Sequence, residues 1–211
     1  MQPDALIPRE FFDRPATEVG PELLGCVLSH RTADGVVAVR ITEVEAYLGQ
    51  SDPASHAYRG PTARTEVMFG RPGHVYVYFT YGMHYCVNLV CQPEGTASAV
   101  LLRAGRVLAG EELARARRPS SRQDLDLASG PARLCQALAI GRAQNGTDAC
   151  AGTSALQVRS SQRSYDEKIC QGPRVGISSA AEEPWRYWIE GDRTVSPYRA
   201  HVPRRREARG K

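Results

Sequence analysis

The dipeptide Asp34-Gly35, placed between two short apolar runs, restricts the fold of this chain more than any other feature. An Asp-Gly pair in this position predicts the tight turn of a β-hairpin, because glycine tolerates the positive φ angles that such turns require. The other apolar runs are also only as long as strands, and none approaches the roughly 18 residues of a membrane-spanning helix. The sequence therefore predicts a sheet-rich protein that does not cross a membrane.

The run after this turn alternates as a strand with one buried face should. Val37, Val39 and Ile41 recur at every second position, and Glu43 and Glu45 follow in the same phase. We therefore expect two carboxylates on the side of the strand that began as apolar. This position is unusual for a surface strand and marks both residues as candidates for function.

The remaining local patterns predict an α+β protein with a single domain over residues 1–203. The expected elements are helices at 8–25, 110–118 and 132–140, and strands at 26–28, 99–103, 172–177 and 185–190. Ser129 is expected to cap the helix that follows it, and residues 142–165 are expected to be irregular. We expect a curved, mostly antiparallel sheet with surrounding helices and a protruding hairpin at 75–88.

Arginine supplies 25 of the 27 basic side chains, at a net charge of +4. Guanidinium groups suit phosphate well, although a general compositional preference for arginine explains this number equally well. The basic stretch at 204–211 is expected to be a frayed tail. The N-terminus lacks a basic region followed by an apolar one, so we expect a cytoplasmic protein. No C-x-x-C pair or metal-type histidine spacing occurs, and we expect neither a metal nor a cofactor.

Glu45 closes the strand and opens a polar stretch, rich in glycine and proline, at 48–72. A carboxylate at such a position can be partly desolvated beside a cleft, and it can then act as a general base toward water. A salt-bridged residue at a strand end fits the same pattern. Glu43 either shares the pocket, as in a paired-carboxylate glycoside hydrolase, or holds an arginine.

Four of the nine tyrosines lie within ten residues, at Tyr76, Tyr78, Tyr81 and Tyr85. Tyr76 and Tyr78 share one face of a strand, whereas Tyr81 lies near the expected hairpin tip. Aromatic rings arranged in this way can stack on nucleic-acid bases, and a residue at a hairpin tip can insert into duplex DNA. The same residues also suit the ordinary core of a β-protein.

Five segments together resemble the 3-methyladenine DNA glycosylase family, also called the alkyladenine or N-methylpurine DNA glycosylases. They are EAYLG at 45–49 leading to His56, VYVYFTYGMHYCVN at 75–88, VLLR at 100–103, SGPARLCQALAI at 129–140 and PRVGIS at 173–178. They occur in the family's order over nearly the whole chain. The resemblance implies a monofunctional enzyme of base excision repair. Such an enzyme flips an alkylated, and in some members a deaminated or etheno, purine out of duplex DNA and hydrolyses its N-glycosidic bond.

Carried over residue by residue, the resemblance implies two catalytic side chains. Glu45 matches the general base that deprotonates water, and Arg103 matches an arginine near that water and the DNA backbone. The implied pocket consists of Tyr47, His56 and Tyr78 around the base, Tyr76 supporting the histidine, and Asn88 excluding guanine through its exocyclic amino group.

The hairpin and the loop before it carry the implied DNA contacts. Tyr81 matches the residue that fills the gap in the duplex, with Met83 beside it, and Arg64 is a candidate phosphate contact. The two lysines, Lys168 and Lys211, lie outside this constellation, so water rather than an amine is the expected nucleophile. We expect a monomer that binds duplex DNA and needs no protein partner.

Two other functions fit parts of the pattern. A non-catalytic protein could bind damaged DNA through the same surface, although a carboxylate beside polyanionic DNA lowers the affinity of a pure binder. A nucleoside hydrolase could use the same acid on free nucleosides, and its binding should depend little on salt. The effect of replacing Glu45 and the salt dependence of binding therefore separate the three functions.

Overall fold

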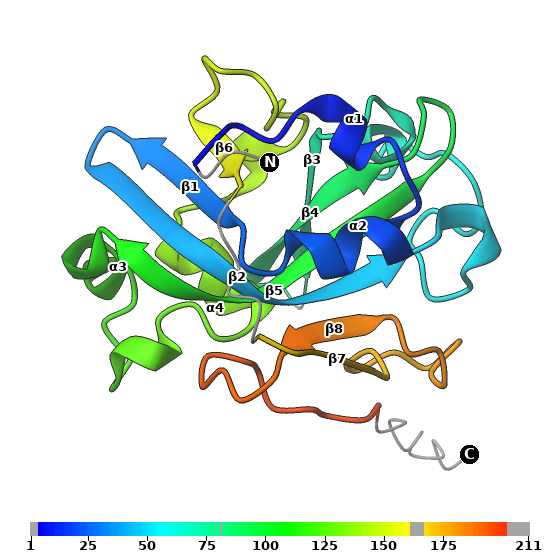
Figure 1. Ribbon diagram of the computed structural model, residues 1–211. Coiled ribbons are helices and arrows are strands. Elements are labelled where there is room, and N and C mark those ends of the chain that lie inside the picture. Colours follow the sequence, from blue (N-terminus) through cyan, green and yellow to red (C-terminus); the bar gives the residue numbers. More distant parts are fainter. Residues whose placement is uncertain (1–3, 81, 161–166, 202–211) are drawn as a thin grey trace, which may run out of the picture.

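The computed structural model describes residues 4–80, 82–160 and 167–201. The strands in these residues form one antiparallel sheet, which curls around a hydrophobic core with short helices packed against it (Figure 1). They are β1 (Val27–Thr32), β2 (Gly35–Tyr47), β3 (Val75–Thr80), β4 (His84–Cys91), β5 (Ser98–Ala109), β6 (Leu156–Arg159), β7 (Ile169–Gly172) and β8 (Arg186–Ile189). The predicted α+β class and curved antiparallel sheet are confirmed. No helix within the described ranges is long and apolar enough to cross a lipid bilayer.

Strand β2 is the centre of the sheet, whose main order is β3-β4-β5-β2-β1-β6. The first half of β2 pairs with β1 through the predicted Asp34-Gly35 hairpin, and the second half pairs with β8 at residues 43–45. Strand β5 runs along its other side for nearly the whole length. One strand therefore connects the hydrophobic half of the sheet to the half that carries the site.

A β-bulge at Thr42 overturns the expected phase of β2. Up to Ile41 the odd-numbered positions face the core, whereas from Val44 onward the even-numbered positions do. Glu43 and Glu45 therefore lie on the opposite face, where both are fully buried. The prediction that they share the apolar side was wrong, because one inserted residue reverses a pattern with a period of two.

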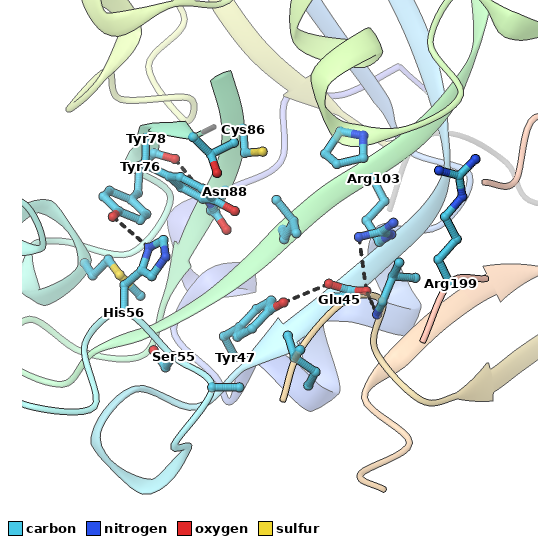
Figure 2. Close-up of a pocket in the computed structure, with 18 of the residues that line it drawn as sticks. Glu45, Tyr47, Ser55, His56, Tyr76, Tyr78, Cys86, Asn88, Arg103 and Arg199 are labelled. Carbon is cyan, nitrogen blue, oxygen red and sulfur yellow. Dashed lines mark hydrogen bonds and ion pairs between the residues drawn. The ribbon is translucent and has the colours of Figure 1, made fainter. Parts of the chain in front are cut away.

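A second irregularity lies opposite this bulge, at Arg103 of β5. Glu43 pairs with Ala104 and Val44 pairs with Leu102, so Arg103 is the extra residue between them. The two insertions compensate, and the strands regain their register beyond this point. Arg103 then projects to the same side as Glu45, toward which it points in Figure 2.

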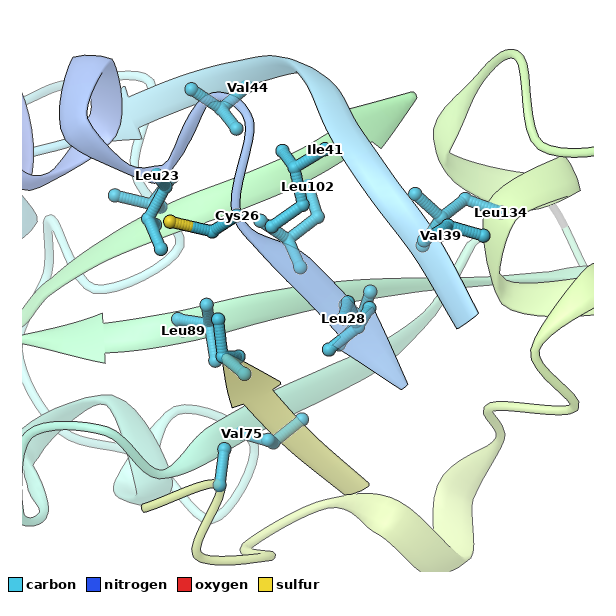
Figure 3. Packing of buried hydrophobic residues seen from close by; sticks show 14 of the residues in the cluster. Leu23, Cys26, Leu28, Val39, Ile41, Val44, Val75, Leu89, Leu102 and Leu134 are labelled. Carbon is cyan, nitrogen blue, oxygen red and sulfur yellow. The ribbon is translucent and has the colours of Figure 1, made fainter. Parts of the chain in front are cut away.

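The helices hold the apolar face of the sheet. They are α1 (Arg9–Phe12), α2 (Ala16–Leu23), α3 (Glu111–Arg117) and α4 (Pro131–Ala137). Helix α2 packs on β2 and β5, and α4 packs on β4 and β5. Leu23, Ile41 and Leu102 are completely buried where α2 meets the sheet (Figure 3). Burial of each such side chain contributes roughly 1.5–3 kcal/mol, so this layer fixes the position of β2 and β5.

The helix predicted at 132–140 is shorter than expected. It starts after Gly130, whose φ is 114°, and it ends at Ala137, because Ala139 adopts a positive φ of 53°. Ser129 is not its cap, since the residue at the cap position is Gly130. The short loop before Pro131 therefore needs a glycine conformation rather than a side-chain hydrogen bond.

Two strands also differ from the predictions. Strand β6 lies inside the region 142–165, which was expected to be irregular, and Leu156 and Val158 supply its buried side chains. It was missed because four residues give a weak pattern. Strand β7 ends at Gly172 instead of beginning there, and residues 173–177 leave the sheet toward the site.

The hairpin predicted at 75–88 is formed by β3 and β4, and Thr80 and His84 are its last paired residues. Near its end, Phe79 and Met83 expose 50% and 67% of their surface. Tyr81, the predicted inserting residue, lies outside the described residues, as does the tail at 204–211.

Candidate active site

A cavity of about 450 Å³ opens between the end of β2, the β3–β4 hairpin and the segment 173–177 (Figure 2). It is lined by all the residues expected in the catalytic centre and base pocket: Glu45, Tyr47, His56, Tyr76, Tyr78, Asn88 and Arg103. Arg199 and Ala200 add a wall from the C-terminal segment that sequence reasoning did not anticipate. The volume suits a small organic group such as a purine base. In the part of the chain that the structure describes, no three His, Cys, Asp or Glu side chains form a potential metal site.

The carboxylate of Glu45 is held on both oxygens. Oε1 accepts a hydrogen bond from the Val175 backbone N–H at 2.7 Å and lies 3.2 Å from Nη1 of Arg103. Oε2 accepts a hydrogen bond from the Tyr47 hydroxyl at 2.8 Å. Each carboxylate oxygen has two lone-pair sites, so Oε2 retains one that can accept a hydrogen bond from a water in the cavity. This geometry suits a general base with a fixed orientation.

Arg103 connects Glu45 to a second, deeper carboxylate. Its Nε donates to Oε1 of Glu43 at 2.8 Å, and its Nη2 donates to Oγ of Ser196 at 3.2 Å. Glu43 also accepts hydrogen bonds from Arg186 Nε and the Ser196 backbone N–H, each at 2.7 Å. Burial alone raises the pKa of Glu43. The charge of Arg103, the Ser196 hydrogen bond and the charge of Arg186 outweigh that effect and lower this pKa below its usual value.

These contacts decide between the two alternatives for Glu43. It holds two arginines, Arg103 and Arg186, and it is not among the described residues that line the cavity. A paired-carboxylate site is therefore not what the geometry shows. Burial lowers the pKa of Arg103, but the charges of Glu45 and Glu43 raise it by more, so its guanidinium stays charged.

Tyr47 supplies both a hydrogen-bond donor and an aromatic wall. Burial and the neighbouring Glu45 carboxylate raise the pKa of Tyr47 well above its usual value, so the phenol stays protonated and donates to Glu45. The chain then turns sharply at Gly49, whose φ is 59°. A Cβ atom at this position would collide with the backbone oxygen of Ala97, so the last residue of the EAYLG motif must be glycine.

A buried ion pair between Arg174 and Asp52 fixes this corner, and sequence reasoning missed it. Both side chains are completely buried, and the Arg174 guanidinium donates to the two oxygens of Asp52 at 2.5 and 3.0 Å. It also donates to the Ala46 carbonyl at 3.0 Å and lies over the rings of Tyr47 and Trp185, at 4.5 and 4.9 Å from their centroids. Arg174 thereby orients Tyr47 and the adjacent Val175. Its presence in the PRVGIS segment was the one available signal.

His56, Tyr76 and Tyr78 form an aromatic group that lies apart from the Tyr47 ring in Figure 2. The Tyr76 hydroxyl and Nδ1 of His56 share a hydrogen bond of 3.1 Å, and the His56 and Tyr78 rings meet edge to face at 4.6 Å. Asn88 donates from Nδ2 to the Tyr76 carbonyl at 3.1 Å, which fixes its amide at the cavity wall. Arg64 is exposed and is not among the described residues that line the cavity; its guanidinium carbon lies 5.8 Å from the Tyr78 ring centroid.

His56 is expected to remain neutral at physiological pH. Desolvation at the cavity wall, with a smaller effect from the charge of Arg64, lowers the pKa of His56 from 6.5 to about 4. Since this pKa is lower in the folded state, protonation favours unfolding, and the protein loses stability as the pH falls from 6.5 toward about 4. We expect an NMR titration to place the His56 midpoint below about 5.5.

The substitution Arg64→Gln should raise this midpoint, because it removes the neighbouring positive charge. Arg59→Gln is the matched control on the same exposed loop, and it should leave the midpoint unchanged. A midpoint near 6.5 in the unsubstituted protein would contradict the prediction.

The chain matches the family model described as methylpurine-DNA glycosylase over residues 10–193. It belongs to the methylpurine-DNA glycosylase family. It is 60% identical over 200 residues to a protein of Streptomyces avermitilis, with 94% of each chain covered. It is 50% identical to a protein of Burkholderia lata and 51% identical to one of Leifsonia xyli, each with 92% of both chains covered. All three relatives are provisionally named 3-methyladenine DNA glycosylases.

The family predicted from five sequence segments is thus confirmed. The region matched to the methylpurine-DNA glycosylases contains both glutamates and the aromatic group of the cavity. Ser196 and Arg199, which hold Arg103 and extend the cavity wall, lie beyond it. The C-terminal segment therefore completes the site from outside the matched region.

Proposed function

We propose that this protein is a monofunctional DNA glycosylase that removes alkylated purines from duplex DNA. The observation that carries the proposal is the position of Glu45, whose carboxylate is oriented by Tyr47, Arg103 and Val175 beside a purine-sized aromatic cavity. Membership of the methylpurine-DNA glycosylase family supports the same activity.

Entry of the base into the cavity requires that the nucleotide leave the duplex, which costs a few kcal/mol of stacking and pairing. We expect Met83 and Phe79, which are exposed near the end of the hairpin, to help fill the gap, the role that the family resemblance assigns to Tyr81. Stacking of the base on aromatic side chains stabilises the flipped nucleotide by roughly 1–3 kcal/mol per base, which offsets part of this cost. A purine alkylated at N3 or N7 is cationic, so the rings of Tyr47 and Tyr78 add a cation–π attraction of about 0.5–2 kcal/mol.

Glu45 then orients a water toward C1′ and accepts its proton as the N-glycosidic bond breaks. The carboxylate also stabilises the oxocarbenium-like charge that develops on the sugar. The cationic base leaves as a neutral purine, so no acid is needed to protonate it. A neutral His56 suits this step, because a second positive charge would repel an alkylated base.

The proposal is tested with duplexes that contain one 3-methyladenine, 7-methylguanine, ethenoadenine or hypoxanthine. From the two cationic bases, 3-methyladenine and 7-methylguanine, we expect release of the free base and an abasic site, with no strand break until alkali is added. The two neutral bases test whether the substrate range extends beyond cationic purines. Sodium borohydride should trap no protein–DNA adduct, since among the described residues Lys168 is the one lysine and it does not line the cavity. Free nucleosides are the control, and cleavage of these alone would identify a nucleoside hydrolase. Binding of damaged duplexes without base release would identify a non-catalytic binding protein.

A further inference from the structure

A second cavity, of about 520 Å³, lies beside the first and has a different chemical character. Its wall carries three arginines, Arg118, Arg122 and Arg133, together with His84. Two serines and a glutamine add further hydrogen-bonding groups. This lining suits an anion rather than a base.

The cavity holds two buried nitrogen atoms without a hydrogen-bond partner in the described structure: Nε of Arg118 and Nδ1 of His84. Arg118 is only 7% exposed, and within the described structure its side chain makes one hydrogen bond, from Nη1 to Oε1 of Gln136 at 3.1 Å. A buried polar group without a partner costs free energy, so native proteins usually satisfy it with a protein group, a water or a ligand. The third such nitrogen among the described residues, Nε of Arg174, stands alone in the corner beside Tyr47, whereas these two lie in one cavity. Two such atoms in one cavity point to a missing ligand.

The charges at the cavity are not balanced. Asp126 is the one acid among the described lining residues, and it is engaged by Arg133 at 3.3 Å. No described carboxylate lies within 4.0 Å of Arg118 or Arg122. Burial and the charge of Arg133 lower the pKa of Arg118 below its usual value, and the charge of Asp126 offsets this effect only in part.

Neighbouring residues line the two cavities. Thr80 lines the first cavity and His84 lines the second, and these two residues are paired at the end of the hairpin. Pro131 and Ala132, neighbours in sequence, likewise line the first and the second cavity. A polynucleotide whose base enters the first cavity would therefore have its sugar–phosphate backbone close to the second cavity.

We propose that the second cavity binds a backbone phosphate of the DNA strand, with Arg118 as its buried cation and Arg122, Arg133 and His84 around it. The inference rests on the proposed function in one respect, because it takes the polymer at the first cavity to be DNA. A diester phosphate satisfies the free Nε of Arg118 and neutralises the cluster. A phosphate held here fixes the distance between the backbone and the base cavity.

The test is the salt dependence of binding to a duplex that carries a tetrahydrofuran abasic site, which cannot be hydrolysed. Loss of one phosphate contact lowers the slope of log K against log salt concentration by about 1, so we expect this change in Arg118→Gln. Arg115→Gln is the matched control. It removes the same charge from α3, but Arg115 pairs with Glu111 and Asp124 outside the cavity, and its slope should not change.

A second measurement locates the contacted phosphate, and a third, on an Asp126 variant, does not require the Arg118 variant to fold. In this experiment single phosphates along the strand are replaced by neutral methylphosphonates. At one position the unsubstituted protein should lose about tenfold in affinity, whereas the Arg118→Gln protein should bind this modified duplex as tightly as it binds the unmodified one. Asp126→Asn, an exposed change that removes the one acid of the lining, should tighten binding by at least about threefold.

Equal slopes for the Arg118 and Arg115 variants, or additive effects of Arg118→Gln and every methylphosphonate, would overturn the proposal. So would saturable binding of inorganic phosphate at millimolar concentration, followed through the Arg118 Nε–H resonance, combined with equal slopes on DNA. That result would assign the cavity to a free phosphate compound. Base release is measured separately, so absence of cleavage with the predicted slopes would contradict the glycosylase proposal alone.

Discussion

Glu45→Gln is expected to reduce the single-turnover rate of base release by at least about 10³-fold, because the amide can neither accept a proton from water nor offset positive charge on the sugar. Binding to damaged duplex DNA should remain within about threefold or become tighter, since the change removes a negative charge from the cavity proposed to bind polyanionic DNA. The two quantities are measured on the same duplex, the rate by alkaline strand cleavage and the affinity by fluorescence anisotropy.

Glu43→Gln is the matched control, on the same strand and with the same burial. Glu43 accepts hydrogen bonds from Arg103, Arg186 and Ser196 but does not line the cavity, so its replacement should lower the unfolding temperature more than Glu45→Gln does. Its effect on base release should be the smaller of the two. A Glu45→Gln protein that keeps its rate within tenfold would assign Glu45 a structural role.

Arg174→Met is expected to lower the free energy of unfolding by roughly 3–5 kcal/mol, because it leaves the fully buried carboxylate of Asp52 without a partner. It also removes the cation between Tyr47 and Trp185 and the hydrogen bond to the Ala46 carbonyl. The fraction of the variant that is folded should therefore release the base more slowly than the unsubstituted protein does, when both are compared at saturating enzyme. Urea unfolding measures the first effect and single-turnover kinetics the second.

The double substitution Asp52→Asn with Arg174→Met should cost less than the sum of the two single changes, since neither charge is then left unpaired. Arg9→Met is a control at the partly exposed pair of Arg9 and Asp148, which lies away from the cavity, and it should cost about 1 kcal/mol or less. Additive losses at Asp52 and Arg174 would show that the pair does not act as a unit.

Local patterns in the sequence were sufficient to predict much of the sheet and the placement of several site residues. The hairpin between β1 and β2 follows from the local Asp34-Gly35 signal, although its turn residues are Ala33 and Asp34 and Gly35 already pairs with Thr32. The shared face of Tyr76 and Tyr78 follows from their spacing. The position of Glu45 at the end of a strand, before a long loop, was also readable. Each of these features depends on residues that are close in sequence.

The features that escaped prediction depend on residues that are far apart in sequence. The bulge at Thr42 lies where β2 changes partners from β1 to β8, and no local pattern encodes that exchange. The Arg174–Asp52 pair joins positions 122 residues apart, and Ser196 reaches Glu43 across 153. The cation cluster around Arg118 likewise forms only when the segments after α3 and around α4 meet the hairpin.

Because of the extra residue at Thr42, strand β2 both supplies the hydrophobic core and presents Glu45 to the active-site cavity, and neither role can change without the other. Deleting Thr42 would turn the second half of the strand over by 180°. The carboxylates of Glu43 and Glu45 would then face the hydrophobic core, and the side chains of Val44 and Ala46 would face the active-site cavity. Such a deletion would therefore abolish both the stability of the fold and the catalytic activity. An insertion or deletion of a single residue in this strand is therefore incompatible with a working protein, because it inverts the period-two pattern of everything that follows.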